Sequence, residues 1–320
     1  GLHEKMGTFE NANTSFHQAA RCKRYTNEVL AFSMVKEEEL LRATEEIQNL
    51  TYRQGEYKIF KVFEPKERLI MALPFYDRVV QHMICNAIQP VFENGFYYHS
   101  YACRSGKGMH AASDTLYQWM YETEVKQGLR MYAFKGDISK YFASIPHDKL
   151  KDENRRYIGD KKALMLMDDI IDHNGILPDG VGIPVGNLTS QLFANVYGNK
   201  LDKFCKHVLH IPYFVRYMDD FIILSDDLEQ LKEWVKRIEE FLENEMLLHI
   251  NPKSTILYAG NGIDFCGYIH YADHKKVRKS SIRKLKQDVK AYELGELPPE
   301  EFKQKGTFRT RRHIPHCKGG

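Results

Sequence analysis

The spacing of apolar residues predicts an alternation of helices and short strands along the 320-residue chain. Up to about Leu50, apolar side chains recur along one helical stripe, and two short strands interrupted by a proline follow. A second helix should end before Gly95, and a third should run from a Ser113 cap to a stop at Gly128. The first part of the chain is therefore expected to be mainly helical.

The second part of the chain should contain more strand. Residues 131–142, MYAFKGDISKYF, are strand-like. A helix with proline in its first turn should start at Ser144-Ile-Pro146, and a second helix is predicted after Gly186. Two short apolar strands flank the pair Asp219-Asp220, and an amphipathic helix over residues 231–246 follows them. One more hairpin precedes the end of the chain. The order of elements is thus strand, helix, helix, hairpin, helix and hairpin.

Charge is distributed unevenly, although the net charge is only +3. From His274 to the last residue there are fourteen Lys or Arg and five Asp or Glu, a net charge of +9 that leaves −6 on the remainder. A basic end on an acidic body is expected of a protein that holds a polyanion with one part and does chemistry with another. A solvated charged helix is the alternative, and charge alone favours neither.

The cysteines and the uncharged segments indicate a soluble protein of a reducing compartment. The six cysteines include no CxxC pair, which argues against a zinc site and against a disulfide scaffold. Residues 180–199 carry no formal charge, but the polar side chains among them would make burial in lipid costly. The first residues lack the pattern of a secretory signal. We expect no membrane association and a cytoplasmic location.

The pair Asp219-Asp220 is the sharpest chemical feature of the sequence. Adjacent acids are common at hairpin tips because Asp favours turns, and this is the alternative to a functional role. The flanking strands are apolar enough to be buried, so two unpaired carboxylates there would repel each other and would need cations. With Asp137 from another strand, three carboxylates could hold two Mg²⁺ ions that clamp the attacking and leaving oxygens of a phosphoryl displacement.

The motif YMDD at residues 217–220, with Asp137 on a preceding strand and the aromatic Phe142 five residues on, resembles the palm of a reverse transcriptase. Further blocks resemble those of bacterial reverse transcriptases and occur in the order of that family: RLIMALPFYDRVVQHMI, SYACRSGKGMH, GIPVGNLTSQLFANVY, NPKSTIL and FCGYIHY. The resemblance covers nearly the whole chain and implies an α+β, right-hand polymerase fold.

The resemblance also implies three domains. Fingers, with part of the palm, would span residues 1–130. A ferredoxin-like antiparallel palm would span residues 131–273, with a fingers-associated insert at about 151–180. A short, basic, helical thumb would span residues 274–320.

The fourth block of the chain is similar to that of diversity-generating retroelement reverse transcriptases. Its characteristic residues are Val185-Gly186 and Ser190-Gln191, whereas intron-type and retroviral enzymes carry glutamine before the glycine. Retroelement enzymes of this type copy a template RNA with errors concentrated at adenines. Phage-defence and other bacterial reverse transcriptases can share the Val-Gly form and remain an alternative.

The resemblance implies roles for the residues that match the family blocks. Asp137, Asp219 and Asp220 would be the catalytic residues and would hold both Mg²⁺ ions, with the Ile138 carbonyl as a further metal ligand. The implied substrate-binding residues are Lys66, Arg68, Tyr141, Phe142, Val185, Gly186 and Lys253.

Three of these substrate assignments have a plain alternative. Lys66 and Arg68 would meet the incoming triphosphate, but the same pair could guard an exposed strand edge. Phe142 would exclude a 2′-hydroxyl, but it could equally belong to the core. Lys253 would neutralise or protonate the pyrophosphate, but it could be a solvated turn lysine.

A further set of residues would contact the nucleic acid. They lie in a glycine-rich basic loop, in the catalytic hairpin, in the block that forms the primer grip and in the basic end of the chain: Arg104, Lys107, Tyr217, Gly267, Tyr268, Arg283 and Lys284. The basic loop is suited to phosphate contact. We expect close backbone approach at Gly267.

The predicted function is RNA-directed DNA synthesis from dNTPs with two Mg²⁺ ions, in a bacterium or phage. The partners implied by the resemblance are a template RNA, a primer or cDNA strand, and a small basic accessory protein. A catalytically idle RNA-binding protein on the same fold is the alternative from another class. The three carboxylates disfavour that alternative, because RNA binding alone has no need of them.

Overall fold

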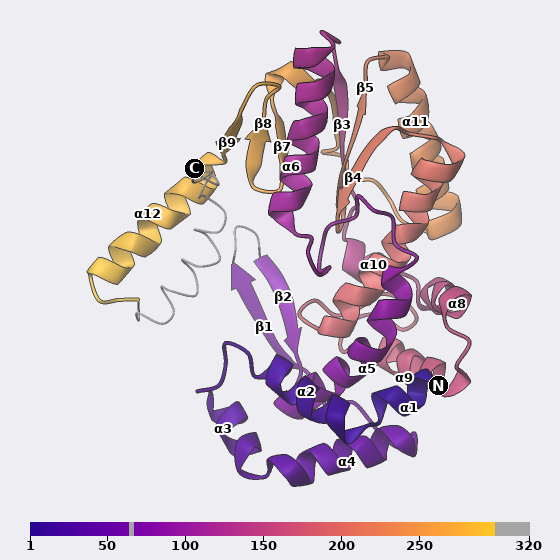
Figure 1. Cartoon of the computed structure of the whole chain (residues 1–320), viewed down its shortest axis with the longest axis vertical. Helices are drawn as coiled ribbons and strands as arrows, with labels where there is room; N and C mark the ends of the chain where they lie inside the picture. Colours follow the sequence, from indigo (N-terminus) through magenta and orange to yellow (C-terminus); the bar gives the residue numbers. More distant parts are fainter. Residues whose placement is uncertain (64–66, 298–320) are drawn as a thin grey trace, which may run out of the picture. The chain divides into compact units, whose positions relative to one another are not determined.

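The structure, a computed structural model, describes residues 1–63 and 67–297 of the chain. The chain forms two compact units, each built from three segments. The first unit contains Gly1–Tyr98, Ile138–His210 and Lys236–Asn251, and the second contains His99–Asp137, Ile211–Val235 and the chain from Pro252 onward. The segments alternate along the chain, as the colours of Figure 1 show, so neither unit is one continuous stretch of sequence.

Helices form the beginning of the first unit. Their bounds are α1 (Leu2–Met6), α2 (Phe9–Ala19), α3 (Asn27–Met34), α4 (Lys36–Gln48) and α5 (Phe75–Glu93). The first three pack against α5, where the Phe32 ring stacks on Phe16 at 5.6 Å and meets Phe75 edge-on at 5.0 Å. The predicted helical start is confirmed, although it is divided into four helices, and α5 ends before Gly95 as expected.

Two antiparallel strands lie between α4 and α5. Strand β1 (Lys58–Phe63) pairs with β2 (Glu67–Ala72), with Lys58 opposite Ala72. The Met71 N–H donates to the Val185 carbonyl at 3.2 Å, which joins β2 to the loop before α10. Both predicted strands are therefore confirmed.

A second group of helices completes the first unit. It contains α7 (Tyr141–Ser144), α8 (His147–Tyr157), α9 (Lys161–Asp172), α10 (Leu188–Lys203) and two π-helical turns, η2 (Phe204–Val208) and η3 (Leu242–Met246). Helix α10 is buried along most of its length. The Tyr141 hydroxyl donates to the Ala194 carbonyl at 2.6 Å, and the Tyr197 hydroxyl donates to the Met246 carbonyl at 2.7 Å. These bonds fix α7 and η3 to the buried helix.

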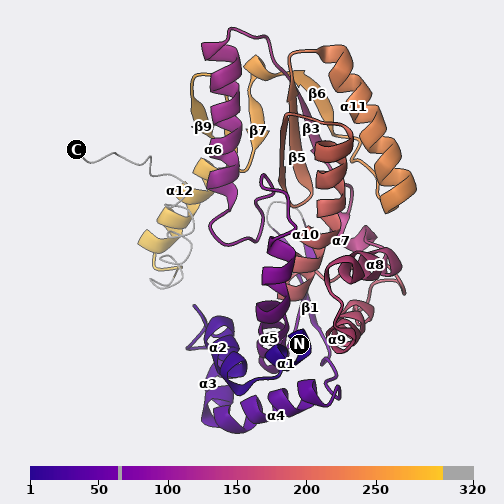
Figure 2. The ribbon, with the colours of Figure 1, turned by 45° about the vertical axis from the view of Figure 1, so that its right-hand side comes forward.

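A four-stranded antiparallel sheet organises the second unit. Its strands, in spatial order, are β4 (Tyr213–Tyr217), β5 (Asp220–Ser225), β3 (Tyr132–Asp137) and β6 (Thr255–Tyr258). Helix α6 (Met109–Met120) lies along the sheet and contacts β4, as Figure 2 shows, and α11 (Leu228–Phe241) begins after β5. The core between α6 and the sheet includes the fully buried Leu116, Ala133 and Leu224.

The start of α6 corrects one expectation from the sequence. The helix begins at Met109 after Gly108, whose φ of +127° suits only glycine, and continues into the π-helical turn η1 (Tyr121–Lys126). Ser113 is therefore not the cap. It is fully buried inside the helix, where its hydroxyl is 2.8 Å from Nε2 of His270, and this pairing could not be read from helical spacing.

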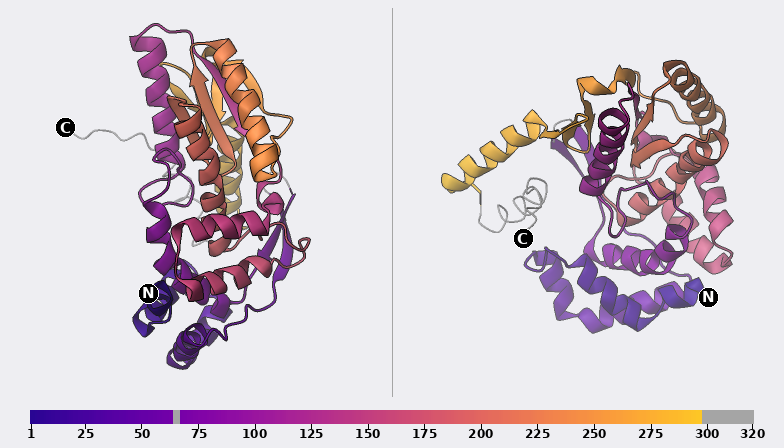
Figure 3. Two further views of the ribbon diagram at one scale, coloured as in Figure 1. Left: turned by 90° about the vertical axis from the view of Figure 1, so that its right-hand side faces the viewer. Right: turned by 45° about the horizontal axis from the view of Figure 1, so that its top comes forward.

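A smaller sheet and a basic helix follow β6. The sheet has β8 (Tyr268–His270) between β7 (Ile263–Phe265) and β9 (Lys275–Val277), all antiparallel. Helix α12 (Lys279–Glu293) contains no buried residue and extends away from this sheet in the right-hand view of Figure 3. Within the described residues, no helix combines the length and the apolar character needed to cross a membrane.

Candidate active site

Three carboxylates meet at one end of the four-stranded sheet. Asp137, the last residue of β3, is directly opposite Asp220, the first residue of β5. Opposite residues in an antiparallel pair have Cβ atoms about 4.5–5.5 Å apart. Asp220 is also opposite Tyr217 across the β4–β5 hairpin, so Met218 and Asp219 form a two-residue turn beside it. The arrangement predicted from the sequence, with acids from neighbouring strands, is what the fold contains.

The Met218-Asp219 turn is held by a buried arginine that sequence reasoning missed. Arg216 on β4 is 0% exposed, and its guanidinium donates to the Met218 carbonyl at 2.8 Å and to the Ser100 hydroxyl at 3.0 Å. Its backbone N–H also donates to the His99 carbonyl at 3.0 Å. Met218 has a φ of +58°, a left-handed conformation that is uncommon for a side chain of this kind. The arginine therefore stabilises a turn that the sequence alone would not favour.

The carboxylates repel one another electrostatically. Burial, followed by the negative charges of Asp219 and Asp137, raises the pKa of Asp220 to about 7, while Lys135 and Arg278 oppose the shift. Those two cations are shared with another acid, since Arg278 Nε donates to Asp264 at 2.9 Å. Burial, with the charge of Asp220 as a lesser cause, also raises the pKa of the nearby Cys266 thiol. A bound cation would relieve this repulsion.

The donor set fits a divalent cation in its chemistry. Carboxylate oxygens are the ligands that hard ions such as Mg²⁺ prefer. Among residues 1–63 and 67–297, no group of three His, Cys, Asp or Glu side chains is already arranged as a metal site. The fit thus rests on the three oxygen donors and on their mutual repulsion.

The β3 end of the site is joined to the loop that carries Lys253. The backbone N–H of Asp137 donates to the Ser254 hydroxyl at 3.0 Å, which places the neighbouring Lys253 at the same end of the sheet as the carboxylates. Lys253 is exposed. The loop therefore brings a basic side chain to the carboxylate end of the second unit.

The turn between β7 and β8 belongs to the same unit. Cys266 and Gly267 have φ values of +50° and +84°, and the Gly267 carbonyl accepts the Arg278 N–H at 3.1 Å. A Cβ on Gly267 would meet no atom within 4 Å among the described residues, so glycine is required here by its backbone conformation. The close backbone approach expected at Gly267 concerns a bound strand and stays a prediction. Tyr268 is half-buried, and its hydroxyl is 3.3 Å from Nδ1 of His110.

The remaining predicted nucleic-acid residues of the second unit occupy three different places. In the glycine-rich loop, Arg104 donates to the Ser100 carbonyl at 2.7 Å, and Lys107 Nζ lies 4.9 Å from the centre of the Tyr101 ring. Tyr217 is half-buried at the end of β4. On α12, Arg283 is exposed and Lys284 is half-buried.

The predicted nucleotide-binding residues belong to the first unit, apart from Lys253. Ile138 is buried and forms an isolated bridge with Ile250. Tyr141 is only 2% exposed, so its ring is part of the core, whereas Phe142 is half-buried and its carbonyl accepts the Ile183 N–H at 2.8 Å. Sequence reasoning had not separated these two neighbouring rings.

The Val185-Gly186 loop is shaped by its contact with β2. Gly186 has a φ of +115°, and a Cβ there would lie 3.1 Å from the Ile70 side chain. Arg68 lies on the same strand, opposite Val62, and Lys66 lies outside the described residues. The glycine of the fourth block is thus required both by conformation and by packing.

Comparison with known families decides the class of the chain. The family model described as reverse transcriptase (RNA-dependent DNA polymerase) matches residues 61–270. The chain belongs to the reverse transcriptase family. Among curated proteins it is 25% identical over 251 residues to protein YkfC of Escherichia coli, covering 64% of this chain and 62% of that protein. It is also 29% identical over 137 residues to an uncharacterized 91 kDa protein in the cob intron of Schizosaccharomyces pombe, covering 41% of this chain and 16% of that protein.

Solved structures show that this reverse transcriptase has the right-hand polymerase fold. Telomerase from Candida albicans, in a complex with a fragment of telomeric RNA, superimposes with a TM-score of 0.53 at 12% identity. The match covers 75% of this chain and 51% of the telomerase chain. The chain therefore spans less than two thirds of the length of the relatives that it matches.

A basic cavity in the first unit of this reverse transcriptase was not found from the sequence. It has a volume of about 260 Å³, and Arg21, Lys23 and Arg78 line it together with Gly186 and Gln191 of the fourth block. Burial lowers the pKa of Lys23, and the charge of Arg78 lowers it further. The cavity therefore favours an anionic ligand beside the fourth block. Its cations come from α5 and from the turn after α2, so no local motif unites them.

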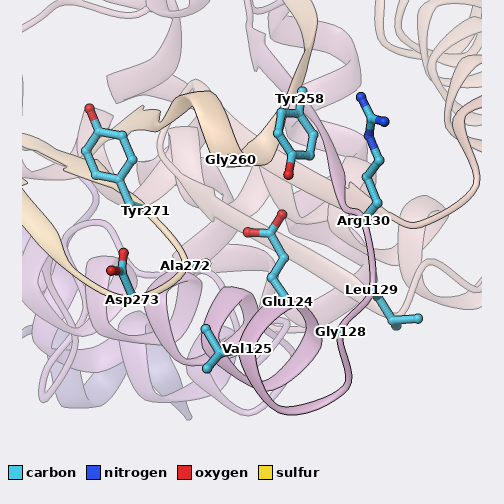
Figure 4. A pocket seen from close by; sticks show the side chains of 10 residues that line it. All are labelled: Glu124, Val125, Gly128, Leu129, Arg130, Tyr258, Gly260, Tyr271, Ala272 and Asp273. Atoms are coloured by element: carbon cyan, nitrogen blue, oxygen red, sulfur yellow. The ribbon is translucent and has the colours of Figure 1, made fainter.

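A larger cavity of about 640 Å³ lies at the opposite end of β3 from the carboxylates (Figure 4). The Tyr258 hydroxyl and the Glu124 carboxylate face each other there, and the Arg130 guanidinium lies 4.9 Å from the centre of the Tyr258 ring. Tyr132 lies next to this cavity, and Asp137 is five positions further along β3. At the usual rise per residue the two are about 17 Å apart. This cavity is therefore distinct from the candidate active site.

Proposed function

We propose that the chain is an RNA-directed DNA polymerase that copies a template RNA into cDNA. The observation that carries the proposal is the position of Asp137 directly opposite Asp220, with Asp219 in the adjoining turn. In the reaction, the primer 3′-hydroxyl attacks the α-phosphorus of a dNTP, a new phosphodiester bond forms, and pyrophosphate leaves. Most of this catalysis is positioning and neutralisation of charge, which suits a site built from carboxylates and nearby cations.

We assign two Mg²⁺ ions to Asp137, Asp219 and Asp220, with the Ile138 carbonyl as a further ligand. When bound, such ions stabilise the charge that develops on the attacking and leaving oxygens. The protein's own part is to hold three carboxylates close together in spite of their repulsion. The raised pKa of Asp220 reflects its burial first and that repulsion second, and the hydrogen bonds of Arg216 keep the turn in place.

The substrate side of the proposal uses residues that match the family blocks. Phe142 would exclude a 2′-hydroxyl, and Val185 with Gly186 would line the nucleotide pocket. Lys66 and Arg68 would meet the triphosphate, with Tyr141 as a core support for Phe142. The exposure of Lys253 at the carboxylate end of the sheet agrees with a role in neutralising pyrophosphate.

The nucleic-acid side assigns the template and primer to basic and aromatic residues. The proposed contacts are Arg104, Lys107, Tyr217, Gly267, Tyr268, Arg283 and Lys284. In domain terms, residues 1–130 would act as fingers, 131–273 as palm and 274–320 as thumb. This division is functional and differs from the two compact units, which interleave along the chain.

We further propose that the enzyme is the error-prone polymerase of a diversity-generating retroelement in a bacterial or phage setting. Support comes from the fourth block, where valine stands before Gly186 and offers only apolar contact to a nascent base pair. A template RNA and a small basic accessory protein would be its partners in the cytoplasm. A phage-defence reverse transcriptase is the rival within the same chemistry.

The polymerase proposal is tested with Asp219→Asn. Loss of one metal ligand should lower single-nucleotide incorporation on an RNA template by on the order of 10³-fold or more, with unchanged far-UV circular dichroism. Asp226→Asn is the matched control, because Asp226 is an exposed acid just after β5. It should incorporate at the parental rate. Near-parental incorporation by Asp219→Asn would rule out the two-metal mechanism.

The retroelement subtype is tested by the fidelity of the parent and of Val185→Gln. We expect frequent misincorporation opposite template adenine in the parent, because an apolar pocket leaves fewer protein groups unsatisfied by a mispair. The amide of Val185→Gln should reduce those errors. Sequencing cDNA made by both proteins on one RNA is the measurement, and low, evenly spread errors in the parent would favour the phage-defence rival.

A further inference from the structure

A cavity of about 370 Å³ on the first unit combines aromatic rings with basic side chains and has no part in the function proposed above. It lies between α8, the end of α10 with η2, and the end of α11. The aromatic lining is Tyr157, Phe204 and Phe241, and the basic lining includes Arg156, Lys200 and Lys203.

The aromatic lining presents flat rings at a partly exposed position. Phe204 and Phe241 are stacked face to face, with ring centres 4.0 Å apart and planes only 2° apart, and both are half-buried. The third ring, Tyr157, is also half-buried and packs edge-on against Phe92 at 5.5 Å. Aromatic faces of this kind stack on any nucleobase, because every base has a π-face.

The basic lining carries more positive charge than its one acid neutralises. Glu153, only 5% exposed, is paired with Arg156 at 3.2 Å and lies 3.9 Å from Lys200. Lys203 Nζ donates to the Tyr157 hydroxyl at 2.6 Å. The Arg156 side chain is 66% exposed, so its remaining donors face solvent. The cavity therefore offers donors for an anion beside rings for a base.

We propose that this cavity binds a nucleotide of single-stranded RNA, with the base against the Phe204–Phe241 pair and a phosphate between Arg156 and Lys203. An acidic peptide would use the cations but would leave the stacked rings without a flat partner. The site would hold a segment of RNA on the first unit. Its existence does not depend on polymerase activity.

Photocrosslinking of the full-length, nucleic-acid-free protein to a single-stranded 20-nucleotide RNA containing 4-thiouridine tests the proposal. Mass spectrometry should find crosslinks on peptides that contain Tyr157, Phe204 or Phe241. In the double variant Arg156→Gln/Lys203→Gln, the yield on those peptides should fall by about fivefold or more, whereas crosslinks elsewhere remain. The magnitude of the salt slope of RNA binding should fall by about 0.7 for each phosphate that the variant no longer neutralises.

The matched control is Lys161→Gln/Lys162→Gln, which removes two exposed charges from the start of α9. It should leave the crosslinks at the cavity unchanged. Absence of crosslinks there, or equal yields from the parent and from Arg156→Gln/Lys203→Gln, would overturn the proposal. Loss of the crosslinks at the cavity on addition of hexaglutamate would also overturn the proposal and would assign the cavity to an acidic peptide. Loss of those crosslinks with AMP at lower concentrations than with oligoadenylate would overturn it too and would assign the cavity to a free nucleotide.

Two further readouts separate this proposal from the polymerase function. Arg156→Gln/Lys203→Gln should extend a short, pre-annealed primer–template at a rate within twofold of the parent, and loss of extension would show that the substitutions disturb the fold or the active site instead. Asp219→Asn should retain the crosslinks at the cavity. Their loss in that variant would place the crosslinked RNA at the carboxylates and contradict a separate site.

Discussion

Two hairpin turns of the second unit have the same length but are stabilised in different ways. Met218-Asp219 joins β4 to β5, and Cys266-Gly267 joins β7 to β8. The first residue of each turn is left-handed, with φ of +58° for Met218 and +50° for Cys266. The second residue is the carboxylate Asp219 in the first turn and Gly267 in the other.

The difference shows how a left-handed hairpin turn can form without glycine. Gly267 adopts a φ of +84° in open space, so its conformation needs no tertiary support. The Met218-Asp219 turn instead depends on Arg216, which reaches the Met218 carbonyl from inside the sheet. A turn that carries a carboxylate is thus fixed by a buried side chain of the strand before it, and this makes the turn sensitive to changes in the core.

The largest effect should come from removing that arginine. Arg216→Met would leave the Met218 carbonyl and the Ser100 hydroxyl without their donor, lowering the free energy of unfolding by about 2–5 kcal/mol and abolishing incorporation. Urea denaturation and single-nucleotide addition are the measurements. Arg237→Met, on the exposed face of α11, should change neither the free energy of unfolding nor the rate of incorporation. A stable and active Arg216→Met would show that the Met218-Asp219 turn forms without the arginine.

A somewhat smaller effect should appear in the pH dependence of stability without metal. Because the folded pKa of Asp220 is about 7, above its ordinary value, the free energy of unfolding should be highest in acid and fall as pH rises from about 4 to about 7. Asp220→Asn should lack this pH dependence, and its free energy of unfolding at pH 8 should exceed that of the parent by on the order of 2–4 kcal/mol.

The check on that prediction is a pair of urea titrations at pH 4 and pH 8 for both proteins. Their difference should nearly vanish at pH 4, where the carboxyl is protonated in the folded state and only about half ionised in the unfolded state. Added Mg²⁺ should stabilise the parent more than Asp220→Asn at pH 8. A difference that does not change with pH would mean that Asp220 is not under electrostatic strain.

The smallest effect should be found in the other turn. Gly267→Ala forces a Cβ into a left-handed conformation and should lower the free energy of unfolding by about 1 kcal/mol, without a steric clash. Gly159→Ala is the control, since its backbone is not left-handed and its surroundings are open, so its stability should change by less than about 0.5 kcal/mol. Thermal unfolding of both variants measures the difference.

The elements of the active site could be predicted from the sequence because their signals are local. Alternating apolar runs on either side of Asp219 indicate a hairpin, and Asp137 ends a third strand of the same character. Arg216 was missed because an arginine within an apolar strand gives no sign of which groups it bonds. Its partners depend on the segment around Ser100, more than a hundred residues earlier.

Contacts over long distances in the chain explain the other errors. Ser113 has the chemistry of a cap, but its partner is His270 on β8, so its burial depends on tertiary structure. The basic cavity beside Gly186 likewise combines Arg21 with Arg78, which lie on different elements and share no motif. Spacing along a chain predicts faces and turns, whereas it carries little information about which faces meet.

The interleaving of the two units has a consequence for biosynthesis. Strand β3 leaves the ribosome with Asp137, but its partner β5 begins only at Asp220 and its other neighbour β6 only at Thr255. At about 5–20 residues per second, the 83 residues from Asp137 to Asp220 take roughly 4–17 seconds to synthesise. During that interval the central strand of the sheet has two unpaired edges, which are the surfaces most prone to aggregation. Slow elongation through this stretch should therefore lower the yield of folded protein, and a chaperone that shields nascent strands should raise it.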